Sequence, residues 1–204
     1  MSTLNSLTHD DLGSAAQRER RKRILDATVA LASKGGFDAV QMRAVAERAD
    51  VALGTLYRYF PSKIHLLVSA LGRQFEEAAS VMEKRAIPGD TPHERVMFVL
   101  GRATKSLQRE PHLTEALTRA FMFADASVAT EIHMVGMHVT RLLVRAMADP
   151  GVDSGDLEPG EDDIAIAKVI GDVWLASLMQ WVTGRASAAD VNSNIDVAVR
   201  LLLR

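Results

Sequence analysis

The most distinctive side-chain chemistry of this sequence falls within the stretch from Arg43 to Lys63. Arginine and lysine side chains donate charge-assisted hydrogen bonds to anions, and tyrosine combines a flat ring with a hydroxyl group. The residues of this kind, with the small and apolar ones between them, are Arg43, Leu53, Gly54, Thr55, Tyr57, Arg58, Tyr59 and Lys63. Two tyrosines, an arginine and a glycine on one exposed helix face are unusual for a surface that meets only water. The group therefore predicts contact with a second, anionic surface.

Two short helices joined by a tight turn must position these residues. Apolar residues at helical spacing predict the first helix, namely Met42, Val45, Ala46 and Ala49. The second helix is expected from about residue 52 to residue 59, and Leu56 and Phe60 should point inward because they are four positions apart. Asp50 lies where the chain must reverse, a position that favours glycine or a residue that tolerates a left-handed backbone. This arrangement is typical of a helix-turn-helix.

Gly54 and the segment after the second helix add two further signals. A glycine near the start of a helix costs about 1 kcal/mol relative to alanine, and close approach of the backbone to another surface is a reason for keeping it. Pro61 ends the helix because it has no amide proton, and Ser62 can cap the helix that follows. Lys63 and the free amides of that helix then form an anion site, for which a DNA phosphate is the natural occupant.

The alternative for this stretch is a small helical hairpin with half-buried aromatic residues, but the turn, glycine, tyrosines and lysine together favour a helix-turn-helix. The segment VALGTLYRYFPSK resembles the DNA-binding signature of TetR-type bacterial transcriptional repressors, and the match extends back through GGFDAVQMRAVAERAD. The resemblance implies contacts to base edges from Arg43, Leu53, Gly54, Tyr57 and Arg58, and to phosphates from Thr55, Tyr59 and Lys63. Asp50 and Ala52 depart from the family pattern, which has Gly at the first position and Ser or Thr at the second. We therefore expect a less relaxed turn and a recognition helix without its usual cap.

A basic helix is expected before this motif, from Ser14 to the glycine pair at residues 35 and 36. Its opening turns carry five basic residues between positions 18 and 23. The run is either a solvated face or a contact to the phosphate backbone or an adjacent minor groove, with Arg20 and Arg23 as the candidates. Residues 1–13 are polar and unpatterned and are expected to form a flexible arm. The DNA-binding domain is therefore assigned to residues 14–61.

Composition places the chain among soluble globular proteins, with 48% hydrophobic and 25% charged residues. It has no cysteine, which excludes disulfides and thiolate zinc sites and fits a reducing cytoplasm. No apolar run reaches the roughly 18 residues of a membrane span, so we expect a cytoplasmic protein that uses no membrane. Residues 1–87 hold 13 basic and 10 acidic side chains, whereas the remainder holds 11 and 16. A basic end on an acidic body is the asymmetry expected of a DNA-binding protein.

The remaining sequence predicts an all-α fold. A linking helix over residues 62–87 is expected to open a larger C-terminal helical domain for ligand binding and dimerisation, residues 62–204. Further helices are expected over about residues 92–109, 112–123, 126–148, 162–186 and 190–203. Thr91 and Glu94 form a possible capping box for the first of them, and residues 149–160 predict a surface loop. The last two helices are either simply core or, as the resemblance implies, the four-helix interface of a homodimer.

Flexible and aromatic side chains accumulate between residues 96 and 147. Methionines fill irregular spaces and suit a cavity for a bulky apolar guest, although most such residues in any helical domain are core. The candidate ligand contacts, two of them from the next helix, are Met97, Phe98, Leu117, Phe121, Phe123, Met137, Trp174 and Leu178. The segments LTEALTRAFMFADAS, DVWLASLMQW and RASAADV resemble TetR-type repressors of sterol catabolism from actinobacteria. That resemblance implies release of DNA by a sterol-derived coenzyme A thioester.

The sequence thus predicts a ligand-responsive transcriptional repressor that binds a palindromic operator as a homodimer and controls lipid or cholesterol catabolism genes. Two alternatives stay open: a TetR-type regulator of efflux or fatty-acid genes with a different apolar ligand, and a helical adaptor protein. No catalytic or metal-binding residue is expected. The six histidines form no i, i+4 pair with a third ligand nearby, and there is no P-loop, GxGxxG or nucleophile elbow. The small-molecule inducer is the only bound group that we expect.

Overall fold

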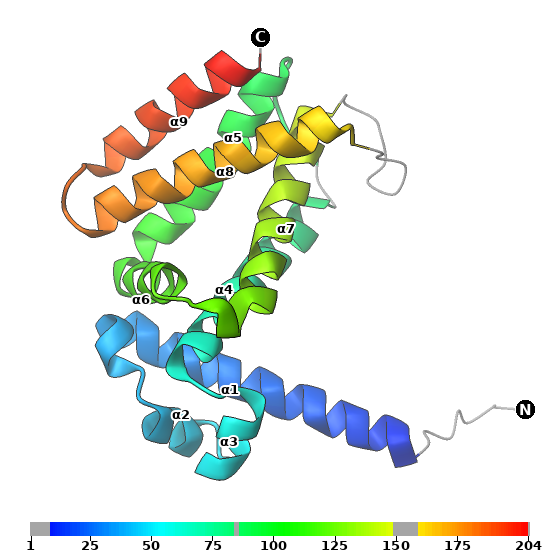
Figure 1. Cartoon of the computed structure of the whole chain (residues 1–204), viewed down its shortest axis with the longest axis vertical. Helices are drawn as coiled ribbons and strands as arrows, with labels where there is room; N and C mark the ends of the chain where they lie inside the picture. The colour runs from blue at the N-terminus through cyan, green and yellow to red at the C-terminus, as the bar shows by residue number, and fades with distance from the viewer. Residues whose placement is uncertain (1–8, 84–85, 149–158, 204) are drawn as a thin grey trace, which may run out of the picture.

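The computed structural model describes residues 9–83, 86–148 and 159–203, which form α-helices and one short 3-10 helix (Figure 1). The expected all-α fold is confirmed. The elements are α1 (His9–Ala39), α2 (Met42–Arg48), α3 (Leu53–Tyr59), α4 (Lys63–Glu83), α5 (Pro92–Arg109), α6 (Pro111–Met122), η1 (Ala126–Val128), α7 (Ala129–Met147), α8 (Glu161–Val182) and α9 (Ala188–Leu202).

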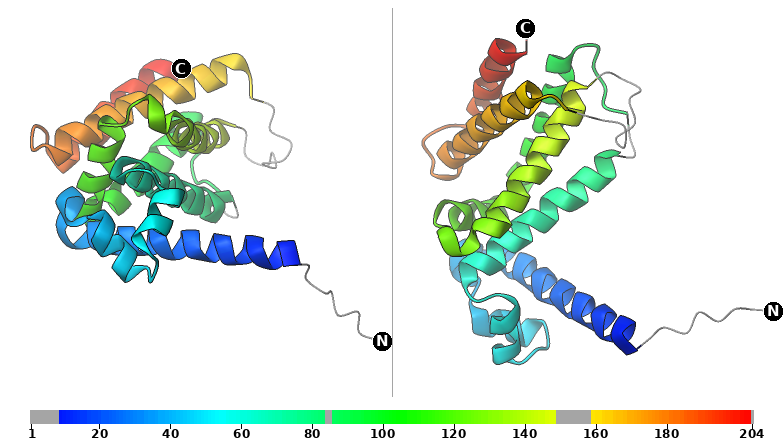
Figure 2. Two further views of the ribbon diagram at one scale, coloured as in Figure 1. Left: turned by 60° about the horizontal axis from the view of Figure 1, so that its bottom comes forward. Right: turned by 45° about the vertical axis from the view of Figure 1, so that its right-hand side comes forward.

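Helices α1, α2 and α3 form one end of the molecule, and α8 and α9 form the other (Figure 1). The two short helices begin within one residue of the predicted positions. The prediction for the first helix was wrong at its start, because α1 begins at His9 and residues 9–13 are helical instead of belonging to a flexible arm. The rest of that arm lies outside the described residues. Figure 2 shows that the first half of α1 projects away from the other helices.

Capping interactions explain where several helices of the C-terminal body begin. The Thr91 hydroxyl accepts a hydrogen bond from the Glu94 amide, and the Glu94 carboxylate accepts one from the Thr91 amide, each at 3.2 Å. This confirms the predicted capping box. The helix expected from residue 126 starts as η1, because the Asp125 carboxylate accepts from the Ser127 amide at 2.9 Å and tightens the chain there. Helix α8 ends at Val182, earlier than expected, and Gly184 turns the chain toward α9 with a φ of 72°.

Two hydrophobic clusters make up the interior. The first joins α1–α4 to α6 and the start of α7, and the second joins α5, α7, α8 and α9. Phe75 of α4 packs against both clusters. Because α6 also packs along α1, the core continues across the predicted domain boundary after residue 61. The helix-turn-helix and the C-terminal body are therefore joined by packed side chains.

Helix α8 is the one described helix that is long and apolar enough to meet the length and composition criteria for a membrane span. The buried residues on its inner face pack into the second cluster, as in the core helix of a globular protein: Ala167, Ile170, Trp174 and Leu178. Its outer face still exposes Val169, and α9 exposes Val197 and Leu201 beside it. An apolar strip therefore remains uncovered on this end of the molecule.

Arg95 fixes the end of α7 against α5. Its side chain is buried, and its guanidinium donates hydrogen bonds to the carbonyl oxygens of Ala146 at 2.9 Å, Met147 at 3.2 Å and Ala148 at 2.9 Å. The last carbonyl groups of a helix have no hydrogen-bond partner within the helix, and they carry the negative end of its dipole. A cationic donor supplies both the missing hydrogen bonds and a compensating positive charge. This contact holds α7 in place.

Candidate DNA interface and ligand cavity

The turn between α2 and α3 has the left-handed geometry predicted for it. Asp50 has a φ of 51°, and the Val51 amide donates to the Ala46 carbonyl at 3.0 Å. The Asp50 carboxylate is fully exposed and lies 3.9 Å from the Arg23 guanidinium. Ala52 begins α3 without a side-chain cap, as its methyl group requires. The turn is therefore strained in the way that replacement of the expected glycine implies.

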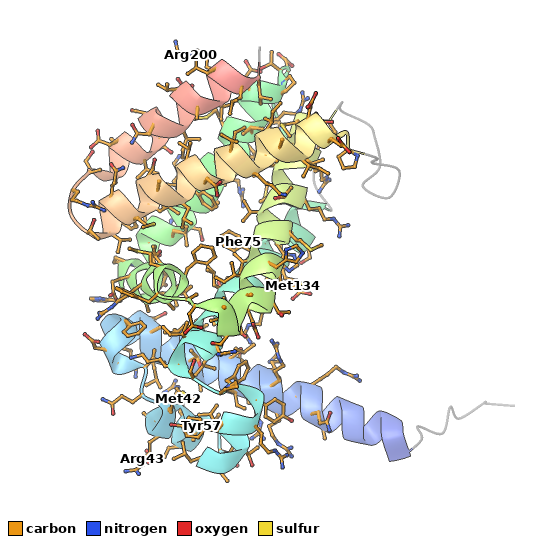
Figure 3. The ribbon with its side chains drawn as sticks, viewed as in Figure 1. Met42, Arg43, Tyr57, Phe75, Met134 and Arg200 are labelled. Carbon is orange, nitrogen blue, oxygen red and sulfur yellow. The ribbon has the colours of Figure 1, made fainter. Side chains whose placement is uncertain are left out.

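Only some of the candidate DNA-contacting residues of the motif are exposed. Leu56 and Phe60 are buried at 0% and 2% exposure, as predicted, and anchor α3 to the first cluster. Four candidates are exposed and together form what we call the outer face: Arg43, Gly54, Tyr57 and Arg58. Leu53, Thr55 and Tyr59 are half-buried, and both Leu53 and Tyr59 pack against the first cluster. Figure 3 shows Arg43 and Tyr57 at the end of the molecule opposite Arg200.

Nothing inside the protein requires glycine at residue 54. A Cβ atom built there would meet no protein atom within 4 Å, and the residue lies within α3. Glycine costs about 0.5–1 kcal/mol in a helix relative to alanine. The absence of an internal reason for this cost is consistent with close approach by a second molecule to the outer face.

The start of α4 has the predicted Ser62 cap, but the Lys63 side chain lies over an aromatic ring. The Ser62 hydroxyl accepts a hydrogen bond from the His65 amide at 3.2 Å and so caps the helix. The Lys63 ammonium, however, lies 3.8 Å from the centroid of the Phe37 ring, and burial there lowers the pKa of Lys63. In this structure the lysine faces the contact between α1 and α6.

The basic run of α1 is partly tied to the helix-turn-helix. Arg20 is half-buried and Arg23 is exposed, with Asp50 as its nearest acidic partner. The guanidinium of Arg21 lies 5.5 Å from the centroid of the Phe60 ring. This run therefore lies next to the turn that precedes α3.

An apolar cavity of about 130 Å³ lies between α4, α6, α7 and α8. Four candidate ligand residues line it: Leu117, Phe121, Trp174 and Leu178. Leu71 and Phe75 of α4 also line it, although neither is among the expected ligand contacts. Figure 3 shows Phe75 in the middle of the molecule, between α6 and α7. The helix that begins at the DNA end thus contributes a wall of the cavity.

A larger and more polar groove of about 620 Å³ adjoins this cavity. Gly136, Thr140 and Lys168 line both spaces, so the two lie side by side. The groove is also lined by the candidate Met137 and by the basic side chains of His133, Arg141 and Arg145. An apolar cavity beside a groove lined by basic side chains suits a ligand with an apolar body and an anionic head.

Three expected ligand contacts lie elsewhere. Met97 packs against the second cluster, whereas Phe98 and Phe123 have side chains that are 37% and 67% exposed. None of the three lines the cavity or the groove. Phe98 lies on the outer side of α5, and Phe123 follows the last residue of α6. Among the described residues no group of three His, Cys, Asp or Glu could hold a metal ion.

The matches to known proteins extend over almost the whole chain. Residues 24–70 match the family model described as bacterial regulatory proteins, tetR family, and residues 89–202 match the tetracyclin repressor-like C-terminal domain. The chain is 58% identical over 203 residues to the HTH-type transcriptional repressor KstR of Mycolicibacterium smegmatis, which covers 100% of this chain and 96% of the relative.

Two solved structures have a similar fold. A TetR transcriptional regulator from Rhodococcus sp. RHA1 superposes with a TM-score of 0.81 at 34% identity, covering 92% of this chain and 97% of that one. The transcriptional regulator FadR from Bacillus subtilis, in complex with stearoyl-CoA, has a TM-score of 0.64 at 21% identity over 89% of this chain and 97% of that one. The second likeness concerns the fold alone.

Proposed function

The chain belongs to the TetR family of bacterial regulatory proteins, and from that premise we propose that it is a cytoplasmic repressor that binds a near-palindromic operator as a homodimer and leaves it when a bulky amphiphilic ligand binds. Members of this family are transcriptional regulators, so the chain is a regulator and not an enzyme or an adaptor. The observation that carries the proposal is the position of α4. This helix begins beside the helix-turn-helix, and its residues Leu71 and Phe75 line the ligand cavity.

The outer face is proposed to enter the major groove. Arg43 and Arg58 offer planar donors suited to guanine, and Tyr57 offers apolar contact and a hydroxyl group. Gly54 lets the α3 backbone come close to the DNA. Leu53 at the edge of this face completes the base-reading set, while Thr55, Tyr59, Lys63, Arg20 and Arg23 are proposed to contact phosphates.

The homodimer is proposed to form through α8 and α9. Val169, Val197 and Leu201 are 48%, 46% and 57% exposed on these helices. A second copy packed by a two-fold axis would bury the same strip on both chains. It would also place two helix-turn-helix motifs about one DNA turn, roughly 34 Å, apart, as an operator with two half-sites requires.

The ligand is proposed to be a coenzyme A thioester of a sterol-derived acid. The cavity alone is smaller than the roughly 300–1,000 Å³ of ordinary ligand sites, but the cavity and groove together reach this range. An apolar sterol body would occupy the cavity between Phe75 and Trp174. The phosphates of the coenzyme would lie in the basic groove near Lys168. The stearoyl-CoA bound to the Bacillus subtilis FadR makes a long fatty acyl thioester the second candidate.

Release is proposed to work through α4. A ligand that enters the cavity presses on Leu71 and Phe75, which lie two and three turns along α4 from Lys63. A small rotation there changes the separation of the two recognition helices in a dimer, and rigid half-site spacing converts this change into lost contacts. By linkage, a ligand that lowers DNA affinity about a hundredfold must bind the DNA-free form more tightly by about 2.7 kcal/mol.

The test has two parts. DNA selected from a random pool by the protein should be a palindrome, and its affinity should exceed that of random duplex; equal affinities would exclude an operator-binding role. Calorimetry with a cholesterol-derived acyl-CoA, stearoyl-CoA and free coenzyme A, each with and without saturating selected DNA, then tests the ligand. Tighter binding of the sterol thioester to DNA-free protein is expected. Equal affinity in the two titrations would exclude coupling, and a preference for stearoyl-CoA would assign the protein to fatty-acid control.

A further inference from the structure

The end of α1 meets α6 through a polar contact that depends on glycine. Gly36 is buried with a φ of 66°, and the Phe37 amide after it donates to the Glu115 carboxylate at 2.8 Å. A Cβ atom on Gly36 would lie 2.5 Å from the same carboxylate oxygen. The backbone angle therefore favours glycine, and an added methyl group would displace the carboxylate that binds the Phe37 amide.

Two cations share the ring of Phe37. The Lys63 ammonium lies 3.8 Å from its centroid, and the Arg119 guanidinium lies 4.4 Å from it. Arg119 is itself held by the Asp38 carboxylate at 3.7 Å and the Glu115 carboxylate at 3.5 Å. The ring thus stands where α1, α4 and α6 meet, and cations on its faces are attracted by its quadrupole.

Helix α6 connects this ring to the ligand cavity. Leu117, Thr118 and Phe121 line the cavity, whereas Glu115 and Arg119 on the same helix hold the Phe37 segment. A displacement of one face of a rigid helix moves the other. The same helix therefore both lines the cavity and contacts the Phe37 ring.

We propose that Phe37 holds the Lys63 ammonium in the DNA-free protein, so that the ring and a DNA phosphate compete for one side chain. This inference rests on the proposed function, in which Lys63 contacts a phosphate. An ammonium over a half-buried ring has lost part of its hydration and faces α6, and it must turn outward to reach DNA. A ligand in the cavity presses α6 onto the Phe37 segment, strengthens this hold and so lowers DNA affinity.

The position of Lys63 can be observed directly by NMR. Methylene protons next to an ammonium that lies over a ring are shifted upfield by the ring current. We expect this shift for Lys63 in the free protein, its loss in Phe37→Leu, and its loss when the wild-type protein is saturated with DNA. Persistence of the shift in the DNA complex would overturn the proposal, because the lysine would then never leave the ring.

DNA affinity provides the second readout. Phe37→Leu should bind a random-sequence duplex and the selected operator about two- to fivefold more tightly than wild type, since a phosphate contact carries no base preference. Phe37→Tyr keeps the ring and should match wild type, and Phe98→Leu, an exposed aromatic of α5, is the control for a general effect. The change Lys63→Ala should abolish the gain. A wild type without DNA binding would contradict the proposed function itself, whereas a wild type that binds DNA no more weakly than Phe37→Leu would contradict only this inference.

Discussion

The indole Nε1 of Trp174 donates a hydrogen bond of 2.9 Å to the hydroxyl of Thr104 and so links α8 to α5 beside the cavity. Both side chains are buried, and the Phe75 ring meets the Trp174 ring edge-on with 5.9 Å between centroids. An indole N–H can only donate, so Thr104 gives the buried N–H of Trp174 its hydrogen-bond acceptor. A buried polar contact therefore helps to hold the Trp174 ring in the wall of the cavity.

Thr104→Val should destabilise the protein by about 1–3 kcal/mol, because valine keeps the shape of threonine but leaves the indole N–H buried without a partner. Trp174→Phe should lower the free energy of unfolding less in the Thr104→Val background than in wild type, because the double variant has neither of the two polar partners. Urea denaturation of the two single variants and the double variant measures this coupling. Thr183→Val, at the exposed end of α8, is the control and should stay within about 0.5 kcal/mol of wild type.

Gly54→Ala should raise the free energy of unfolding by about 0.5–1 kcal/mol and at the same time weaken DNA binding. The gain follows because the new methyl group meets no protein atom, and the loss follows if the α3 backbone approaches DNA. Gly101→Ala in α5 is the matched control, because its added methyl group also meets nothing. It should stabilise the protein without changing DNA affinity. Unchanged DNA affinity in Gly54→Ala would remove this residue from the interface.

Arg43→Ala should cost about 1–3 kcal/mol of operator affinity and relax base preference at one position of each half-site. The reason is that an exposed arginine near the start of α2 can make a bidentate contact to guanine. Repeating the DNA selection with the variant measures the preference. Arg48→Ala removes an exposed arginine from the other end of the same helix and should leave the selected sequence unchanged. Identical selected sites for wild type and Arg43→Ala would refute the assignment of Arg43 as a base reader.

Val197→Asp should shift the protein from dimer to monomer, because the proposed interface would then bury an unpaired charge on each chain. Val81→Asp is closely matched, since Val81 is 49% exposed on α4 and Val197 is 46% exposed on α9. Sedimentation at micromolar concentration should give a monomer for the first variant and a dimer for the second. Loss of the dimer in both, or in neither, would argue against the α8 and α9 interface.

Acid should destabilise the protein in part through its helix caps. Hydrogen bonds from the amides of Asp90 and Thr91 hold the pKa of the Glu94 carboxyl below its ordinary value of 4.5. The unfolded chain then binds the proton more tightly, so this stabilisation is complete above about pH 4.5 and is lost as the pH falls through the lower folded pKa. Glu94→Gln retains an acceptor but does not titrate. Its free energy of unfolding should therefore fall less steeply than that of wild type between about pH 5 and pH 3, and parallel curves would exclude this contribution.

Local sequence signals were sufficient for most of the secondary structure and for the helix-turn-helix. The spacing of Leu56 and Phe60 specified which side of α3 is buried, and the position of Asp50 specified the left-handed turn, because both depend on residues only a few positions apart. The Thr91 capping box was predictable for the same reason. The start of α1 was not, since residues 9–13 have no apolar pattern and helix can extend through polar residues without one.

Only the tertiary structure decided which of many apolar residues surround a cavity and which charged residues meet an aromatic ring. Phe98 and Phe121 are the same residue type on neighbouring helices, yet one is exposed and the other lines the cavity, because the packing angle of each helix determines its inner face. Likewise Lys63 and Phe37 are 26 positions apart and come together because α4 packs against α1. The sequence by itself therefore determined the elements and the DNA-reading motif, whereas long-range packing decided the cavity and the contact that links it to Lys63.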